Sequence, residues 1–223
     1  MESYSANIEN QLRESGSAID LLAIQWYRII DCVWRVHFVM RQLQRDLYQQ
    51  LRVEAIDTRE RIAALVRPLD AAKLNEHPEP NGWSVGQVLE HLCVADERYE
   101  SPLASVLARA RKDADASGRE WKPSFIGGLI AGGLLRPRPQ KSPKVFQPGL
   151  TPRNGVVDEV LTREKNFVKA MDDAASLDWR ALRISSPALP SWAPKMNLGD
   201  GFRIHIIHLT RHSHQVERLV ARL

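Results

Sequence analysis

The chain reads WSVGQVLEHLCVADERY from Trp83 to Tyr99. Ser84, followed three residues later by Gln87, forms the capping-box pattern that begins an α-helix. Apolar residues then recur at helical spacing, at Val85, Val88, Leu89, Leu92, Ala95 and Tyr99. We expect this helix to continue to about residue 110 and to bury one face in the interior of a helical protein.

Further helices are predicted on both sides of this one. Residues 17–67 contain neither Pro nor Gly, which is typical of a long helical stretch. Another helix is expected over about 154–175, with Val160 and Val168 on its buried face, and a last one from about 197 onward. Because no stretch alternates like a strand, the sequence predicts an all-α protein, most simply a four-helix bundle. Residues 113–152, with their Gly-Gly pairs at 127–128 and 132–133, are expected to form a long irregular connection.

The predicted domain comprises residues 53–223, because four helices already account for this part of the chain. Residues 1–52 are then an N-terminal helical extension. Two interpretations remain open for it: an additional helix that packs on the bundle or on a partner, or a start codon that lies further downstream. We favour the additional helix.

Composition narrows the class of protein. Of 223 residues, 43% are hydrophobic and 26% are charged, an ordinary balance for a globular domain. No window resembles a membrane span or a secretory signal, and two cysteines make no disulfide framework, so a soluble cytoplasmic protein is expected. The net charge of +4 comes from residues 121–150, which contain five Lys or Arg, five Pro and no acidic residue. This is typical of a solvated loop, and we do not expect nucleic acid or a membrane as a partner.

Histidines are concentrated near the C-terminus, where four of the seven lie between positions 205 and 214. At about 100° per residue, His205, His208, His212 and Gln215 share one face of a helix, and His214 points away. His208 and His212, four residues apart, can direct two ring nitrogens at one zinc or nickel ion.

A third ligand must come from another helix, and His91 is the candidate because it lies on the buried stripe of its helix. The alternative is that His91 is a hydrogen-bonded core residue without a metal. His205 is a candidate further ligand, a hydrogen-bond partner of a ligand, or a residue at the rim. Gln215 is expected either to hydrogen-bond a ligand imidazole or to border the pocket.

These motifs resemble the DinB-like (YfiT-like) superfamily of metalloenzymes. Residues 83–92 look like the second-helix signature of that family, and His208-x3-His212-x2-Gln215 matches its last-helix motif. The segments 142–148 and 196–202 are also similar, and the resemblance covers about residues 53–223. It implies a four-helix bundle in which His91, His208 and His212 bind a divalent metal ion, with zinc and nickel expected.

Three histidines leave one position of a tetrahedral ion open for a small-molecule substrate. The open position suits either hydrolysis or the activation of a thiol. Members of the family that are known enzymes use low-molecular-weight thiols such as mycothiol or bacillithiol. Positions 87, 88, 94 and 95, which share the face of His91, contain no carboxylate that could act as a general base. The sequence therefore favours a metal-dependent thiol transferase.

Two alternatives stay open: a metal-dependent hydrolase, and a non-catalytic stress-response or binding module in which the metal only joins the helices. No catalytic residue is assigned from the sequence, and a homodimer is a hypothesis.

Overall fold

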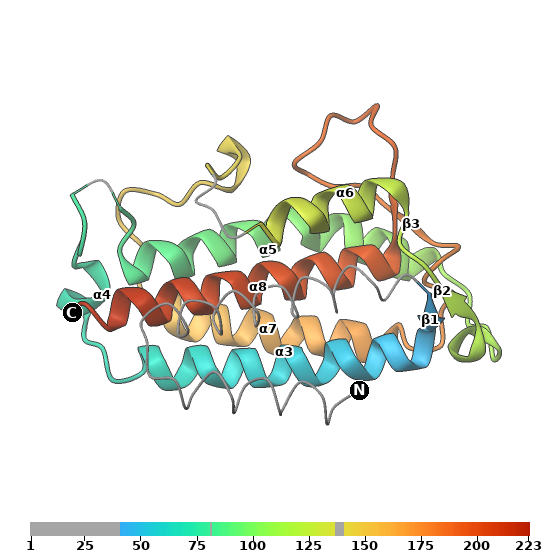
Figure 1. Cartoon of the computed structure of the whole chain (residues 1–223), viewed down its shortest axis with the longest axis horizontal. Coiled ribbons are helices and arrows are strands. Elements are labelled where there is room, and N and C mark those ends of the chain that lie inside the picture. The colour runs from blue at the N-terminus through green and yellow to red at the C-terminus, as the bar shows by residue number, and fades with distance from the viewer. Residues whose placement is uncertain (1–40, 81, 137–140) are drawn as a thin grey trace, which may run out of the picture. The chain divides into compact units, whose positions relative to one another are not determined.

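The computed structural model describes residues 41–80, 82–136 and 141–223. Four long helices form a ring in which α3 packs on α8, α8 on α5, α5 on α7, and α7 on α3 (Figure 1). Their bounds are Gln44–Val66 for α3, Val85–Arg109 for α5, Val156–Asp173 for α7 and Leu198–Val220 for α8. The predicted all-α four-helix bundle is thus confirmed.

Side-chain caps fix where the helices begin. At the start of α5, the Ser84 hydroxyl accepts a hydrogen bond from the backbone N–H of Gln87. The Gln87 side-chain oxygen accepts one from the backbone N–H of Ser84, as the sequence predicts. Asn197 and Asp200 form the same reciprocal arrangement at the start of α8. Each box satisfies backbone N–H groups that a helix start leaves without intrahelical partners.

Short elements connect the bundle. They are α4 (Ala71–Asn75), the 3-10 turns η1 (Ala116–Gly118) and η2 (Lys144–Phe146), and four two-residue strands: β1 (Gln42–Leu43), β2 (Glu120–Trp121), β3 (Arg183–Ile184) and β4 (Met196–Asn197). β1 pairs with β2 and β3 with β4, both antiparallel. None of the helices in the described part of the chain is long and apolar enough to cross a bilayer.

The expected boundary between residues 52 and 53 falls inside α3, since this helix begins at Gln44. The chain divides into two compact units, of which the bundle starts at Arg41. Of the expected extension over residues 1–52, residues 1–40 lie outside the described residues, and residues 44–52 belong to α3.

The expectation of an irregular connection over 113–152 was wrong in one place, because Phe125–Leu134 forms the helix α6. Its glycines disfavour a helix on intrinsic propensity, but its ends are bound to α8. Ser124 caps the start, and its backbone N–H donates to Asp200 at 2.9 Å. At the other end, the Arg211 guanidinium donates to the carbonyl oxygens of Leu134 and Arg136. Tertiary packing on α8 thus outweighs the weak propensity.

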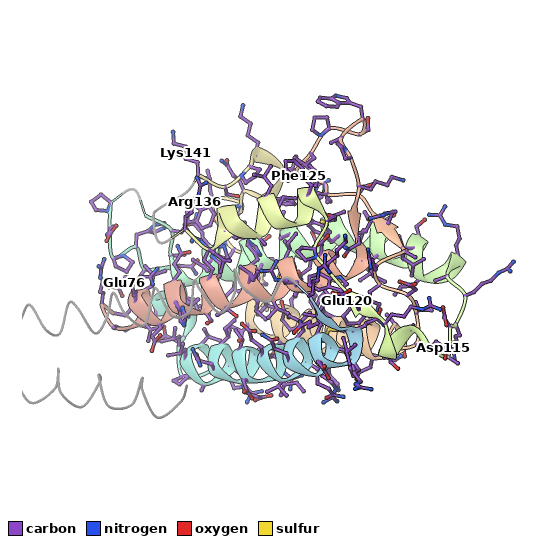
Figure 2. The ribbon with its side chains drawn as sticks, turned by 45° about the vertical axis from the view of Figure 1, so that its right-hand side comes forward. Glu76, Asp115, Glu120, Phe125, Arg136 and Lys141 are labelled. Carbon is purple, nitrogen blue, oxygen red and sulfur yellow. The ribbon has the colours of Figure 1, made fainter. Side chains whose placement is uncertain are left out.

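The outer side of α6 is exposed. Phe125 at its start is 86% exposed, and Arg136 and Lys141 lie on the same side of the molecule (Figure 2). The basic segment of the sequence therefore contributes charge to the surface next to α6.

The bundle interior contains two apolar clusters rather than one. One includes Trp121, Trp179 and Phe202, and the other includes Leu89, Leu92 and Leu209. Polar residues occur on every long helix near the boundary between the two clusters: Thr58 on α3, Asp96 on α5, Glu164 on α7, and His205 and His208 on α8. We call this group the polar layer.

Candidate metal centre

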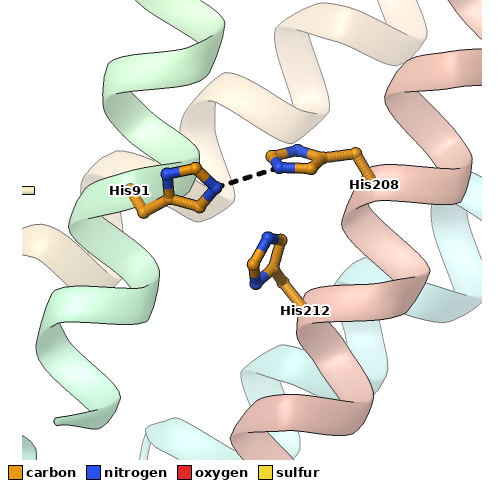
Figure 3. Close-up of side chains that lie close together, drawn as sticks. All are labelled: His91, His208 and His212. Atoms are coloured by element: carbon orange, nitrogen blue, oxygen red, sulfur yellow. Dashed lines mark hydrogen bonds between the residues drawn. The ribbon is translucent and has the colours of Figure 1, made fainter. Parts of the chain in front are cut away.

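Three imidazoles converge between α5 and α8 (Figure 3). His91 projects from α5, and His208 and His212 project from successive turns of α8. One ring nitrogen of each lies within 4.8 Å of the others, and the ring centroids are 4.5–4.9 Å apart. The Nε2 atoms of His91 and His208 are 3.0 Å apart. Ligand nitrogens of a tetrahedral site with bonds of about 2.0–2.1 Å stand about 3.3 Å apart, so small rotations suffice to fit an ion.

Hydrogen bonds orient two of the three rings. His91 Nδ1 donates to the carbonyl oxygen of Phe146 at 2.6 Å, and His212 Nδ1 donates to Gln215 Oε1 at 2.9 Å. Both acceptors assign the ring proton to Nδ1, so Nε2 is the unprotonated nitrogen of His91 and of His212, and that of His91 can accept from His208 Nε2. Metal-binding histidines are typically held in this way by a group behind the ring. Gln215 is thus a hydrogen-bond partner of the His212 ring.

All three rings are held neutral. Burial lowers the pKa of His91, and burial together with the neighbouring rings lowers that of His208 well below its usual value. Burial, followed by the electrostatic interaction with the His91 ring, lowers the pKa of His212 to about 3. Neutral imidazole is the form that binds a metal ion, so near pH 7 no proton has to be displaced.

The chain segment 146–153 covers the N-terminal half of α5 and provides the acceptor for His91. Gln87 Nε2 donates to the carbonyl oxygens of Gly149 and Leu150, at 3.2 and 3.1 Å. Arg153 donates to both carboxylate oxygens of Glu90, at 2.8 and 2.9 Å. Consecutive turns of α5 therefore bind this segment next to the candidate ligand.

An aromatic side chain lies beside the His91 ring. The Trp83 indole lies 5.1 Å from the His91 ring, centroid to centroid, so Trp83 borders the candidate site as well as the start of α5. Phe146 is buried and stacks on Tyr99. Cys93, on the same helix, is fully buried, and burial raises the pKa of its thiol to about 12. Cys93 is thus a core residue.

His205 does not join the three-histidine group. Its Nε2 lies 2.9 Å from Glu164 Oε2, and its Nδ1 lies 3.4 Å from Asp96 Oδ1. The sequence reasoning missed both carboxylates. A signal for Glu164 existed, because this residue lies four positions after Val160 and four before Val168, on the buried stripe of α7.

Comparison with known proteins agrees with this architecture. The sequence model of the DinB superfamily matches residues 54–216, which include α5, α7, most of α3 and α8, and the three converging histidines. No curated protein and no solved structure gave a significant match. Since the match covers well over half of the chain, the protein belongs to the DinB superfamily.

Proposed function

We propose that the protein is a metal-dependent thiol transferase, in which His91, His208 and His212 bind one zinc or nickel ion. The proposal rests on the convergence of three neutral imidazoles without a fourth protein ligand. Within the described ranges, no other His, Cys, Asp or Glu joins this group. Three protein ligands and one open position are typical of catalytic rather than structural zinc sites.

The metal, when bound, would lower the pKa of a substrate thiol and so supply a thiolate near neutral pH. In the transfer, the thiol sulfur forms a bond to the carbon of an electrophile, the bond from that carbon to its leaving group breaks, and the thiol proton passes to solvent. His91 and His212 would contribute by keeping their Nε2 atoms directed at one point, through the bonds to Phe146 and Gln215.

The thiol has to come from a second substrate. Within the described residues, Cys93 is the one cysteine. Its thiol is buried and has a raised pKa, so it is unsuited to attack an electrophile. A low-molecular-weight thiol such as mycothiol or bacillithiol would fill this role. Exposed basic residues in the connection that follows α6, among them Lys141 and Lys144, would attract an anionic thiol or acid.

Purified protein tests the proposal directly. We expect one equivalent of zinc or nickel at the three-histidine centre by elemental analysis, and metal-dependent conjugation of a fluorogenic bimane electrophile with one of the bacterial thiols. His212→Ala should lose this equivalent and the acceleration. His214→Ala is the matched control, since this exposed residue is two positions away and contacts Arg61. Absence of metal-dependent acceleration with every thiol would overturn the proposal.

A metal-dependent hydrolase is the second candidate, favoured by the carboxylates of Asp96 and Glu164 in the bundle interior. These two carboxylates interact with His205. Metal-dependent hydrolysis of ester or amide substrates, with no thiol conjugation, would select this alternative. A metal-loaded protein that is inactive in both assays would favour the non-catalytic module.

A further inference from the structure

The polar layer of the bundle holds a second group of potential metal ligands. Asp96, Glu164 and His205 come from three different helices, and one ligand atom of each lies within 4.8 Å of the other two. None of them belongs to the three-histidine group, although Asp96 follows His91 by five residues and His205 precedes His208 by three. At 1.5 Å per residue, the two groups are offset by roughly 5–8 Å along the helix axes.

This group of charged side chains is buried in the bundle interior, where apolar side chains would stabilise the fold at least as well. Glu164 is 1% exposed, and the side chains of Asp96 and His205 are each 14% exposed. Apolar residues of similar volume usually stabilise a core at least as well as a buried ion pair. The cost of burying these charges is consistent with a role other than stability.

Two carboxylate oxygens in the group have no hydrogen-bond partner. They are Asp96 Oδ2 and Glu164 Oε1, both fully buried. An unsatisfied buried acceptor is costly, and more so when it is charged. One imidazole therefore does not satisfy the two carboxylates, and each retains an oxygen that can bind a cation.

The charges of the group are compatible with the exchange of two protons for a divalent cation. Burial, followed by the charge of Glu164, raises the pKa of Asp96. Burial alone would lower the pKa of His205, but the charges of Glu164 and Asp96 raise it to about 9. Since the pKa of Asp96 is raised to about 8, Asp96 holds a proton near pH 7, and the group is neutral with Glu164 and His205 ionised. A divalent cation would replace the protons of Asp96 and His205 and leave the group neutral, with two carboxylates and a neutral imidazole around it.

We propose that Asp96, Glu164 and His205 form a second divalent-cation site, distinct from the three-histidine centre. Two carboxylates and one imidazole are a harder donor set than three imidazoles, and this suits Mn²⁺ or Fe²⁺ as well as Zn²⁺. Phe167 stacks on His205 with ring centroids 3.5 Å apart and planes 12° apart, which fixes the plane of the ligand ring. Donor atoms within 4.8 Å need only small side-chain rotations to reach bonds of about 2.0–2.2 Å.

Metal stoichiometry tests the second site. Full-length metal-free protein is dialysed against Zn²⁺, and bound metal is measured by elemental analysis. We expect two equivalents in the wild type, one in Glu164→Gln and one in His212→Ala. Mn²⁺ binding, followed through the loss of the free-ion EPR signal, should weaken at least tenfold in Glu164→Gln and in Asp96→Asn.

Glu159→Gln is the matched control, because Glu159 lies on the same helix but pairs with Arg163 near the surface. It should bind both metals like the wild type. Circular dichroism and the retained, His212-dependent zinc equivalent establish that each variant is folded. The proposal fails if the folded Glu164→Gln and Asp96→Asn variants keep wild-type stoichiometry and Mn²⁺ affinity, or if the wild type binds a single equivalent that His212→Ala removes. The three-histidine centre is judged separately by the equivalent lost in His212→Ala.

Discussion

The Nδ1 atom of His91 lies 2.6 Å from the carbonyl oxygen of Phe146, 55 residues further along the chain. This hydrogen bond joins the candidate ligand on α5 to the 146–153 segment that covers it. It sets the tautomer of His91 and directs Nε2 toward His208, 3.0 Å away. Metal binding should therefore depend on how firmly the segment is attached to α5.

Arg153→Met tests this dependence. The substitution removes the contacts that Arg153 makes with both oxygens of Glu90, a largely buried carboxylate. We expect the zinc affinity to fall about tenfold, which is typical when a group that orients a metal ligand is lost. The free energy of unfolding should fall by about 1–3 kcal/mol. Competition with a chromophoric chelator and urea denaturation measure the two effects.

Arg163→Met provides the control for this prediction. Arg163 shares the partner Glu97 with Arg153, and its bonds go to acidic residues other than Glu90. Equal zinc affinity in the two variants would show that the segment does not support His91.

Gln215 supports the second oriented ring. Gln215→Ala removes the acceptor of His212 Nδ1, so we expect a zinc dissociation constant 10–100 times that of the wild type. Gln215→Glu retains an acceptor at the same place and should bind zinc at least as tightly as the wild type. Wild-type affinity in both variants would contradict a role for Gln215 in orienting His212.

The sequence predicted the site to the extent that side-chain type and helical spacing determine it. His208 and His212 lie one turn apart on α8, and His91 lies on the buried stripe of α5, so their convergence follows from the bundle. The contact with Phe146 was not predictable, because its acceptor is a backbone carbonyl in a connection. Asp96 and Glu164 were not predicted, because Asp96 lies outside the positions that share the face of His91 and Glu164 lies on another helix.

The helix α6 shows a different limit. By its low intrinsic helix propensity, glycine predicts a loop. In α6, glycine instead allows a close approach between two helices. A Cβ atom on Gly127 would overlap the carboxylate of Asp200, which caps α8 and binds the start of α6. Such a need for close approach is visible only once the two segments are placed together.

Neighbouring glycines of α6 provide a matched test of this explanation. Gly127→Ala should destabilise the protein by about 1–3 kcal/mol, as overpacking does, because Asp200 and the start of α6 must shift. Gly128→Ala places its Cβ in open space and should be neutral or stabilise the helix by up to about 1 kcal/mol. Denaturant midpoints measure both, and a Gly127→Ala variant as stable as Gly128→Ala would contradict the close packing.

Asp178 should make the stability of the bundle depend on pH. Burial alone would raise the pKa of this carboxyl, but hydrogen bonds from the backbone N–H groups of Ala181 and Arg180 and from the Arg119 guanidinium lower it. Arg119 also pairs with Asp113, so this guanidinium links two carboxylates.

Because the folded-state pKa of Asp178 lies below the unfolded value, the ionised carboxylate stabilises the fold above the unfolded pKa of about 3.9. This contribution is lost as the pH falls through the lower, folded-state pKa. Asp178→Asn should therefore be less stable than the wild type by about 1 kcal/mol at pH 7, and the difference should shrink below about pH 4. Asp173→Asn, which removes only an exposed pair with Lys169, should differ from the wild type by less than about 0.5 kcal/mol. Urea denaturation between pH 3 and pH 7 checks both, and a difference for Asp178→Asn that stays constant over this range would contradict the assignment.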